Sequence, residues 1–230
     1  MKRTFSTILA VTGLSLVAFN ATANSLNSKQ DKLSYSIGVQ TGKAFQTHNV
    51  QINPKVFAAG LADAQKGGPY EMTDADMTAT LAAFRKESLE KLKAQIQHLS
   101  AVNSKNGAAF LAANKKKSGV KITASGLQYK IIKKGHGKPP SLTDTVTVNY
   151  RGSLINGKVF DSSYQRGKPV TFPVNGVIKG WQEALQMMKP GAVWMLYIPS
   201  DLAYGSRGAP GAIGPNEVLI FKVQLISVKR

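Results

Sequence analysis

The sequence predicts an α+β protein in two parts: an all-helical N-terminal half that ends in one very long helix, and a C-terminal antiparallel half-barrel sheet wrapped over one short helix. Apolar residues recur near a period of 3.6 up to about residue 118, and from residue 121 they alternate with a period of two. The stretch 74–116 contains no proline and a single glycine, Gly107. We therefore expect a helical domain over 24–118 and a sheet domain over 119–230.

The first segment, 1–23, is typical of an export signal. Lys2 and Arg3 form a positive start, an apolar stretch follows over 8–19, and the Ala-Thr-Ala at 21–23 fits the A-x-A rule for signal peptidase. The apolar stretch is short and interrupted, which disfavours the alternative of an uncleaved membrane anchor. The mature chain would then begin at Asn24 and work outside the cytoplasm.

Two short helices are expected next, because each carries its own start signal. Ser28 with Asp31 resembles a capping box, in which the two side chains and backbones satisfy each other. Asn53 followed by Pro54 places an N-cap residue before the position that proline favours. The Gly-Gly-Pro segment at 67–69 should end the second helix.

The third helix, opened by Thr73 with Asp76, should run over 74–116. Roughly 43 residues at 1.5 Å each span about 65 Å, which a compact domain of this size cannot cover. Its narrow apolar stripe consists of Met77, Leu81, Phe84, Leu92, Leu99, Val102 and Phe110. The helix should therefore cross into a second chain or bridge two lobes, and the small helical core favours a homodimer. The alternative is a helix broken near Gly107.

The second half predicts several strands and one helix. Apolar residues alternate over 127–131, 146–150 and 219–225, and a further apolar strand covers 192–198. Glycine, proline and asparagine mark the turns between these strands. The helix at 181–188 is the single candidate to lie across the sheet.

Composition excludes several function classes. The chain has no Cys and only three His, far apart in sequence, so thiolate chemistry and histidine metal clusters are not expected, although a carboxylate-only metal site stays open. No P-loop or G-x-G-x-x-G is present, and we expect neither metal nor cofactor. The net charge of +18 suggests polyanion contacts, but no DNA- or RNA-binding motif accompanies it. We therefore expect no specific nucleic-acid partner.

The sheet half offers no nucleophile with a base, because no His follows His136 and its acidic residues are isolated. It is instead rich in aromatic residues. Core packing alone could account for them. However, Phe160 and Asp161 lie beside a turn and Tyr204 begins a loop, places where functional side chains concentrate. The aromatic candidates are Tyr150, Phe160, Phe172, Trp181, Tyr204 and Phe221.

Six blocks within 121–230 resemble, in order and spacing, the FKBP-type peptidyl-prolyl isomerase domain. They are 148–152 (VNYRG), 157–163 (GKVFDSS), 177–181 (VIKGW), 188–191 (MKPG), 198–205 (IPSDLAYG) and 214–221 (GPNEVLIF). With the predicted signal and long helix, the whole chain resembles the macrophage infectivity potentiator (Mip-like) subfamily. The resemblance implies a homodimer joined through the N-terminal helices, located in the periplasm, at the outer membrane, on the cell surface or outside the cell.

The resemblance also implies the site residues. Trp181 would form the floor of a proline pocket and Asp161, with Phe160, would face the twisted amide and pair with Arg166. The Tyr204 hydroxyl and the Ile178 amide would bind the substrate. Family members often carry larger side chains where this chain has Val170, Ala209 and Ala212. The other predicted substrate-binding residues are Tyr150, Phe172, Val177, Ile213 and Phe221.

Two function classes follow from these observations. One is a prolyl isomerase that acts on proline-containing peptides and proteins outside the cytoplasm and is inhibited by macrolides of the FK506 or rapamycin kind. The other is a dimeric chaperone or binding module in which the pocket is only a docking site. We expect the isomerase, combined with chaperone-like clamping by the dimer.

Overall fold

The computed structural model describes residues 26–230. The predicted signal segment, 1–23, therefore lies outside the described residues. The chain divides into two compact units, residues 1–74 and 75–230. Among the helices described, none combines the length and the apolar character that a membrane span requires.

Two helices form the described part of the first unit: α1 (Lys29–Thr47) and α2 (Pro54–Lys66). The capping box of Ser28 and Asp31 is confirmed, with the Asp31 amide donating to the Ser28 hydroxyl over 2.9 Å. Asn53 caps α2, and the helix stops at Gly67. In the single chain, neither helix has a buried residue. The apolar side chains of this unit therefore lack a core of their own.

The long helix α3 (Asp74–Asn114) runs for 41 residues without a break at Gly107. Most of its apolar stripe stays exposed, with Leu81 54% and Leu92 52% accessible, whereas Phe110 near its end packs on Tyr197 of β6. Gly107 is buried against Val218 of the sheet domain. A Cβ at position 107 would lie 2.7 Å from Cγ2 of Val218, so only glycine allows this close approach. The C-terminal part of α3 thus packs on that domain. For this reason the chain divides into its two compact units between residues 74 and 75. The sequence places the domain boundary between residues 118 and 119.

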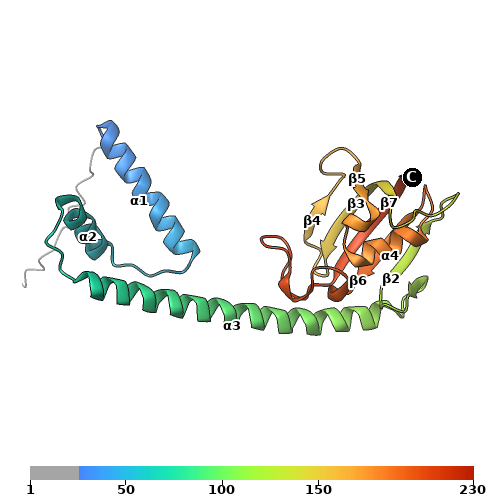
Figure 1. Ribbon diagram of the computed structural model, residues 1–230, viewed down its shortest axis with the longest axis horizontal. Coiled ribbons are helices and arrows are strands. Elements are labelled where there is room, and N and C mark those ends of the chain that lie inside the picture. The colour runs from blue at the N-terminus through green and yellow to red at the C-terminus, as the bar shows by residue number, and fades with distance from the viewer. Residues whose placement is uncertain (1–25) are drawn as a thin grey trace, which may run out of the picture. The chain divides into compact units, whose positions relative to one another are not determined.

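A seven-stranded antiparallel sheet forms the rest of the second unit (Figure 1). The strands follow the order β1-β2-β6-β7-β3-β4, and β5 pairs with β3 outside this path. The longest pairing joins β3 to β7 over ten residues of register. The strand bounds are β1 (Val120–Ile122), β2 (Gln128–Lys133), β3 (Thr145–Leu154), β4 (Val159–Ser162), β5 (Val170–Pro173), β6 (Val193–Ile198) and β7 (Leu219–Lys229).

Helix α4 (Lys179–Met187) covers the sheet, as Figure 1 shows, and begins two residues before the predicted helix. Its buried face, with Trp181, Ala184 and Leu185, joins the strand residues in one core. This confirms the predicted architecture of a helical N-terminal region followed by an antiparallel sheet over one short helix. The strands β1, β4 and β5 were not among those predicted from the sequence. Phe160 and Asp161, expected beside a turn, are strand residues of β4.

Candidate active site

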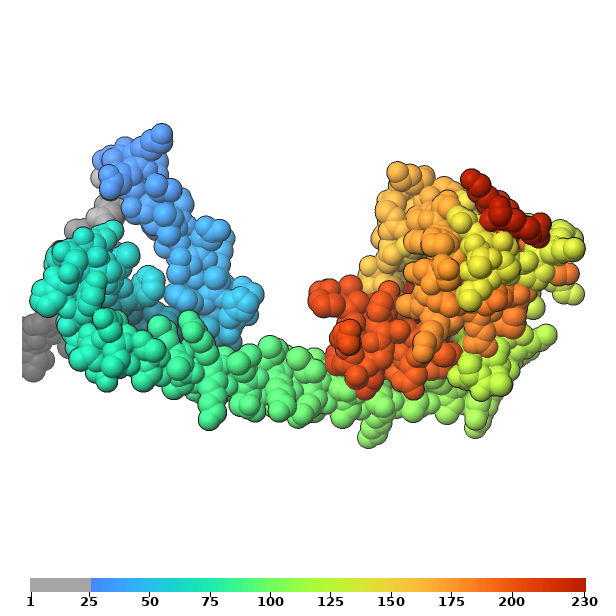
Figure 2. Space-filling model, viewed as in Figure 1, coloured from blue at the N-terminus to red at the C-terminus, as the bar shows by residue number. Residues whose placement is uncertain are grey.

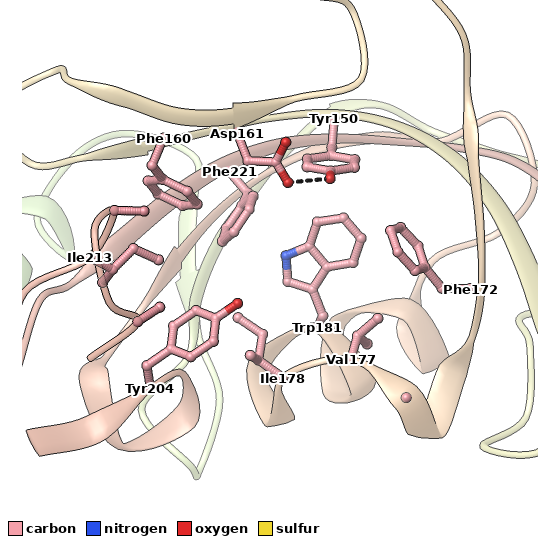
Figure 3. Close-up of a pocket in the computed structure, with 13 residues that line it drawn as sticks. Tyr150, Phe160, Asp161, Phe172, Val177, Ile178, Trp181, Tyr204, Ile213 and Phe221 are labelled. Atoms are coloured by element: carbon pink, nitrogen blue, oxygen red, sulfur yellow. Dashed lines mark hydrogen bonds between the residues drawn. The ribbon is translucent and has the colours of Figure 1, made fainter. Parts of the chain in front are cut away.

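An open pocket of about 620 Å³ lies between α4, the inner sides of β3, β4 and β7, and the segment that leads into β7 (Figure 3). Most of the side chains that line it are aromatic or aliphatic. Its lining residues are Tyr150, Phe160, Asp161, Phe172, Gly176, Val177, Ile178, Trp181, Tyr204, Ala209, Ala212, Ile213 and Phe221.

Trp181, in the first turn of α4, forms the floor of the pocket (Figure 3). The rings of Tyr150 and Phe221 meet its indole edge-on, each with centroids 5.2 Å away, and Phe172 does so at 6.2 Å. Such perpendicular contacts place the positive ring edges against the negative faces and hold the rings rigidly. The Trp181 Nε1 is buried and has no hydrogen-bond acceptor in the described part of the chain.

One glycine makes this aromatic arrangement possible. Gly152 lies in β3, opposite Asp161 of β4 and Phe221 of β7. A Cβ on Gly152 would come within 2.7 Å of both the Phe160 and the Phe221 ring. The missing side chain therefore lets these two rings pack edge to face at 5.4 Å.

Two polar side chains, Tyr150 and Asp161, form the opposite edge of the pocket, and Arg166 stands behind them. Asp161 accepts hydrogen bonds from the Tyr150 hydroxyl and from the guanidinium of Arg166, with which it forms an ion pair. Arg166 also donates to the Tyr150 oxygen over 2.8 Å. Partial burial would raise the pKa of Asp161, but the bonds from Tyr150 and Arg166 outweigh it and hold that pKa below its usual value. Burial, with the bond to Asp161, raises the pKa of Tyr150.

These shifts give a pH prediction. The Asp161 pKa is depressed, so its carboxylate should stay ionised, and the ion pair intact, down to below about pH 4. Any activity of the pocket that needs this carboxylate should therefore be flat through neutral pH and fall only below that value. The measurement is kcat/KM from pH 3 to 9, with circular dichroism to identify acid unfolding. A loss of activity centred between pH 5 and 7 in folded protein would contradict the prediction.

The remaining wall comes from a segment that we call the rim loop, residues 205–217. It contributes Ala209, Ala212 and Ile213 to the pocket, and Tyr204 precedes it. In Figure 3 the Tyr204 hydroxyl points toward the centre of the pocket, which we call the aromatic cup. Within the described chain, no group hydrogen-bonds the amide of Ile178, which lines the pocket as the N-cap of α4. The Tyr204 hydroxyl is thus open to a ligand in the pocket, and the Ile178 N–H has no partner among the described residues.

The structure brings ten of the eleven predicted site residues together in the pocket lining. Arg166 is the exception: it is not part of the lining and reaches the site through Asp161 and Tyr150. Gly176 was missed, and Ala209 and Ala212 were noted only as departures from the family. Small residues carry no chemical signal in a sequence, so only the folded wall reveals them. In residues 26–230 no three His, Asp or Glu side chains gather into a metal-binding group.

An aromatic cup with one carboxylate, two phenol hydroxyls and, within residues 26–230, no nucleophile–base pair is the kind of site that suits a compact apolar ring. The comparisons with known proteins agree. Residues 137–226 match the family "FKBP-type peptidyl-prolyl cis-trans isomerase", and residues 30–131 match the domain amino-terminal to it. The chain belongs to the FKBP-type peptidyl-prolyl cis-trans isomerases, in their Mip-like subfamily.

Individual relatives resemble the chain over most of its length. "Peptidyl-prolyl cis-trans isomerase Mip" of Coxiella burnetii is 56% identical over the whole of both chains. "Outer membrane protein MIP" of Legionella longbeachae is 49% identical over 96% of each. Among solved structures, FkpA from Escherichia coli has 35% identity and a TM-score of 0.69 over 88% of this chain and 98% of its own.

Proposed function

We propose that the aromatic cup is the catalytic site of this isomerase, that Asp161, Tyr204 and Phe160 act on the amide, and that the remaining lining residues bind the proline. The observation that carries the proposal is the buried indole of Trp181, framed by perpendicular rings and open to solvent on one side only through the pocket. A proline ring fits such a floor without any polar group to desolvate.

The mechanism follows from the amide itself. Rotation about an X-Pro bond has a barrier of about 18–20 kcal/mol because the planar amide is stabilised by resonance. The twisted amide loses this resonance, so its oxygen carries less negative charge and needs less hydration. An apolar cup therefore stabilises the twisted state more than the planar one, which is the requirement for catalysis. The ionised Asp161, fixed by Tyr150 and Arg166, sets the field at the edge of the cup.

A protease-coupled assay on a proline tetrapeptide tests this proposal. The purified chain should accelerate the cis-to-trans step, and a macrolide of the FK506 or rapamycin kind should compete for the cup. If the chain binds proline peptides but leaves the isomerisation rate unchanged, the cup is only a docking site and the second function class is correct.

Tyr204→Phe should have a mild effect on this assay. The change removes only the hydroxyl that points into the cup, and one neutral hydrogen bond is worth about 0.5–1.5 kcal/mol. We expect kcat/KM to fall roughly two- to thirteen-fold. Tyr164→Phe is the matched control, because Tyr164 is 49% exposed and is absent from the pocket lining. Equal activities of the two variants would remove Tyr204 from the site.

We also propose that the protein is a homodimer joined through its helical half. Helices α1 and α2 bury no residue, and Leu33, Ile37 and Leu61 are each more than half exposed. The apolar stripe of α3 is uncovered as well. In aqueous solution, exposed apolar area of this extent on helices that lack a core marks a surface that another apolar surface covers. A second copy of the same helices offers the complementary one.

Sedimentation at micromolar concentration tests the dimer. The mature chain should sediment at twice its monomer mass, and Leu33→Asp with Ile37→Asp should yield monomers because charges cannot be buried in the interface. The control is Ser34→Asp with Ser36→Asp, which adds the same charge beside the stripe on α1. A wild-type chain that sediments as a clean monomer rules the dimer out.

We propose, finally, that the enzyme acts on proteins outside the cytoplasm and that the dimer clamps unfolded clients between its two isomerase domains. The predicted signal at 1–23 and the outer-membrane name of the Legionella relative support the location. N-terminal sequencing of the exported chain should begin at Asn24. A chain truncated to 98–230 should keep its activity on tetrapeptides but lose the ability to speed refolding of a large proline-limited protein.

A further inference from the structure

The rim loop has few attachments of its own. Near its tip, Ala209 and Ile213 exchange backbone hydrogen bonds of 2.9 Å each. At its base, the Asn216 amide donates to the Gly205 carbonyl over 2.9 Å. These bonds shape the loop internally but leave its position over the cup to other contacts. That position matters, because Ile213, buried to 7% exposure, forms one wall of the pocket.

The missing attachments come from the long helix. The Asn103 side-chain amide donates to the Pro215 carbonyl over 2.9 Å, and the Asn216 side-chain amide donates to the Ser100 hydroxyl over 2.7 Å. Val218, the residue that directly follows the rim loop, packs against Gly107. Positions 100, 103 and 107 are spaced by three and four residues, so they share one face of α3. Figure 2 shows the orange-red atoms of the loop resting on the green atoms of α3.

The same face of α3 carries a second anchor, which does not involve the rim loop. Farther along, the Gln128 side chain of β2 bridges the Leu111 carbonyl and the buried Asn114 side chain, which fixes the helix end to the sheet. The helix is therefore held on the domain independently of the loop. The two asparagine bonds then act on the loop alone.

Resting on the proposed function of the cup, we propose that Ser100 and Asn103 of α3 are positioning residues of the proline site, which act through the rim loop on Ile213. The long helix is then a structural part of the substrate pocket as well as a connector. The floor and the polar edge come from α4, β3 and β4, which these bonds do not touch. Releasing the loop should therefore weaken substrate binding and leave the turnover of bound substrate intact.

Asn103→Asp in the full chain is the test. It keeps the shape of the side chain but turns a carboxylate oxygen toward the Pro215 carbonyl in place of an N–H donor. The matched control is Asn106→Asp, which makes the same chemical change at an exposed position of α3. Asn103→Gln, which restores a donor, serves as the conservative rescue.

We expect three readouts to separate the variants. The KM for a proline tetrapeptide should rise about five- to ten-fold in Asn103→Asp, with kcat within about twofold of wild type, since one hydrogen bond is lost. Amide hydrogen exchange over 205–217 should accelerate by a similar factor, while β3 and β7 stay protected. Asn103→Gln should recover part of both effects, and Asn106→Asp should show neither.

Equal KM values and equal exchange in Asn103→Asp and Asn106→Asp would overturn the inference, and so would a loss of kcat at unchanged KM. Failure of the proposed function looks different: the wild-type chain itself would then show no isomerase activity. In that case the exchange contrast over 205–217 would still decide whether α3 positions the loop.

Discussion

The Trp181→Ala variant should bind proline ligands about 30-fold more weakly than the wild-type protein, the largest loss of binding expected in this site. The change removes the floor of the cup and about 2 kcal/mol of apolar contact with the ligand, at roughly 25 cal/mol per Å². It also empties a volume at the centre of the core, because Trp181 is only 4% exposed. Isothermal titration with a macrolide ligand, combined with denaturant unfolding, measures both consequences.

Two variants separate lost binding from lost stability, since an emptied core position costs about 3–5 kcal/mol and the alanine variant can unfold. Trp181→Phe keeps a ring on the floor and should bind about fivefold more weakly. Trp194→Phe makes the same change at the other tryptophan, which stacks on Tyr129 at 4.5 Å and is not in the pocket lining. If both variants bound proline ligands equally well, Trp181 would be a core residue without a role in binding.

Asp161→Ala should reduce kcat/KM on proline tetrapeptides roughly 10- to 150-fold, while the fold survives. The lost interactions are hydrogen bonds to a charged group, worth about 1.5–3 kcal/mol. Stability should change little, because the Asp161 side chain is 39% exposed and its ion pair with Arg166 is screened by solvent. The isosteric Asp161→Asn variant should lose activity as well. Its remaining kcat/KM should not fall at acidic pH in the way expected of the wild type, because it has no carboxylate to protonate.

Arg166→Met distinguishes how Asp161 acts. If the carboxylate itself faces the substrate, losing its partner should cost less activity than losing Asp161. Asp201→Ala is the control for a carboxylate near the site, because Asp201 is exposed and absent from the pocket lining. Full activity in folded Asp161→Ala protein would mean that the resemblance assigns the wrong residue to this role.

Local patterns predicted those elements whose signals lie within a few residues of each other. The start of α1 at the Ser28–Asp31 box, the Asn53 cap and the stop at Gly67 are backbone hydrogen-bonding problems that neighbouring side chains solve. The short strands β4 and β5 could not be predicted from the sequence, because four residues give too few alternations to reveal a period of two. Their pairing with β3 is what forms them.

The packing face of α3 shows the limit most clearly. The sequence offers a narrow apolar stripe, and most of it stays exposed, with Leu99 41% accessible, although its last member, Phe110, packs on Tyr197 of the sheet. The face that packs on the sheet domain carries Ser100, Asn103 and Gly107, which no hydrophobic pattern selects. A polar side chain becomes a contact residue only when a partner such as the Pro215 carbonyl stands at the right distance.

The sequence by itself determined the two-part α+β architecture, the unbroken reach of the long helix and the aromatic set of the cup, because periodicity, caps and six spaced motifs are local properties of the chain. Only the tertiary structure decided that Arg166 bonds the Tyr150 hydroxyl as well as Asp161, that Gly152 makes room for two rings, and that α3 holds the rim loop. Each of these depends on a distance between residues of different strands, helices or loops, and such distances are fixed when these elements pack.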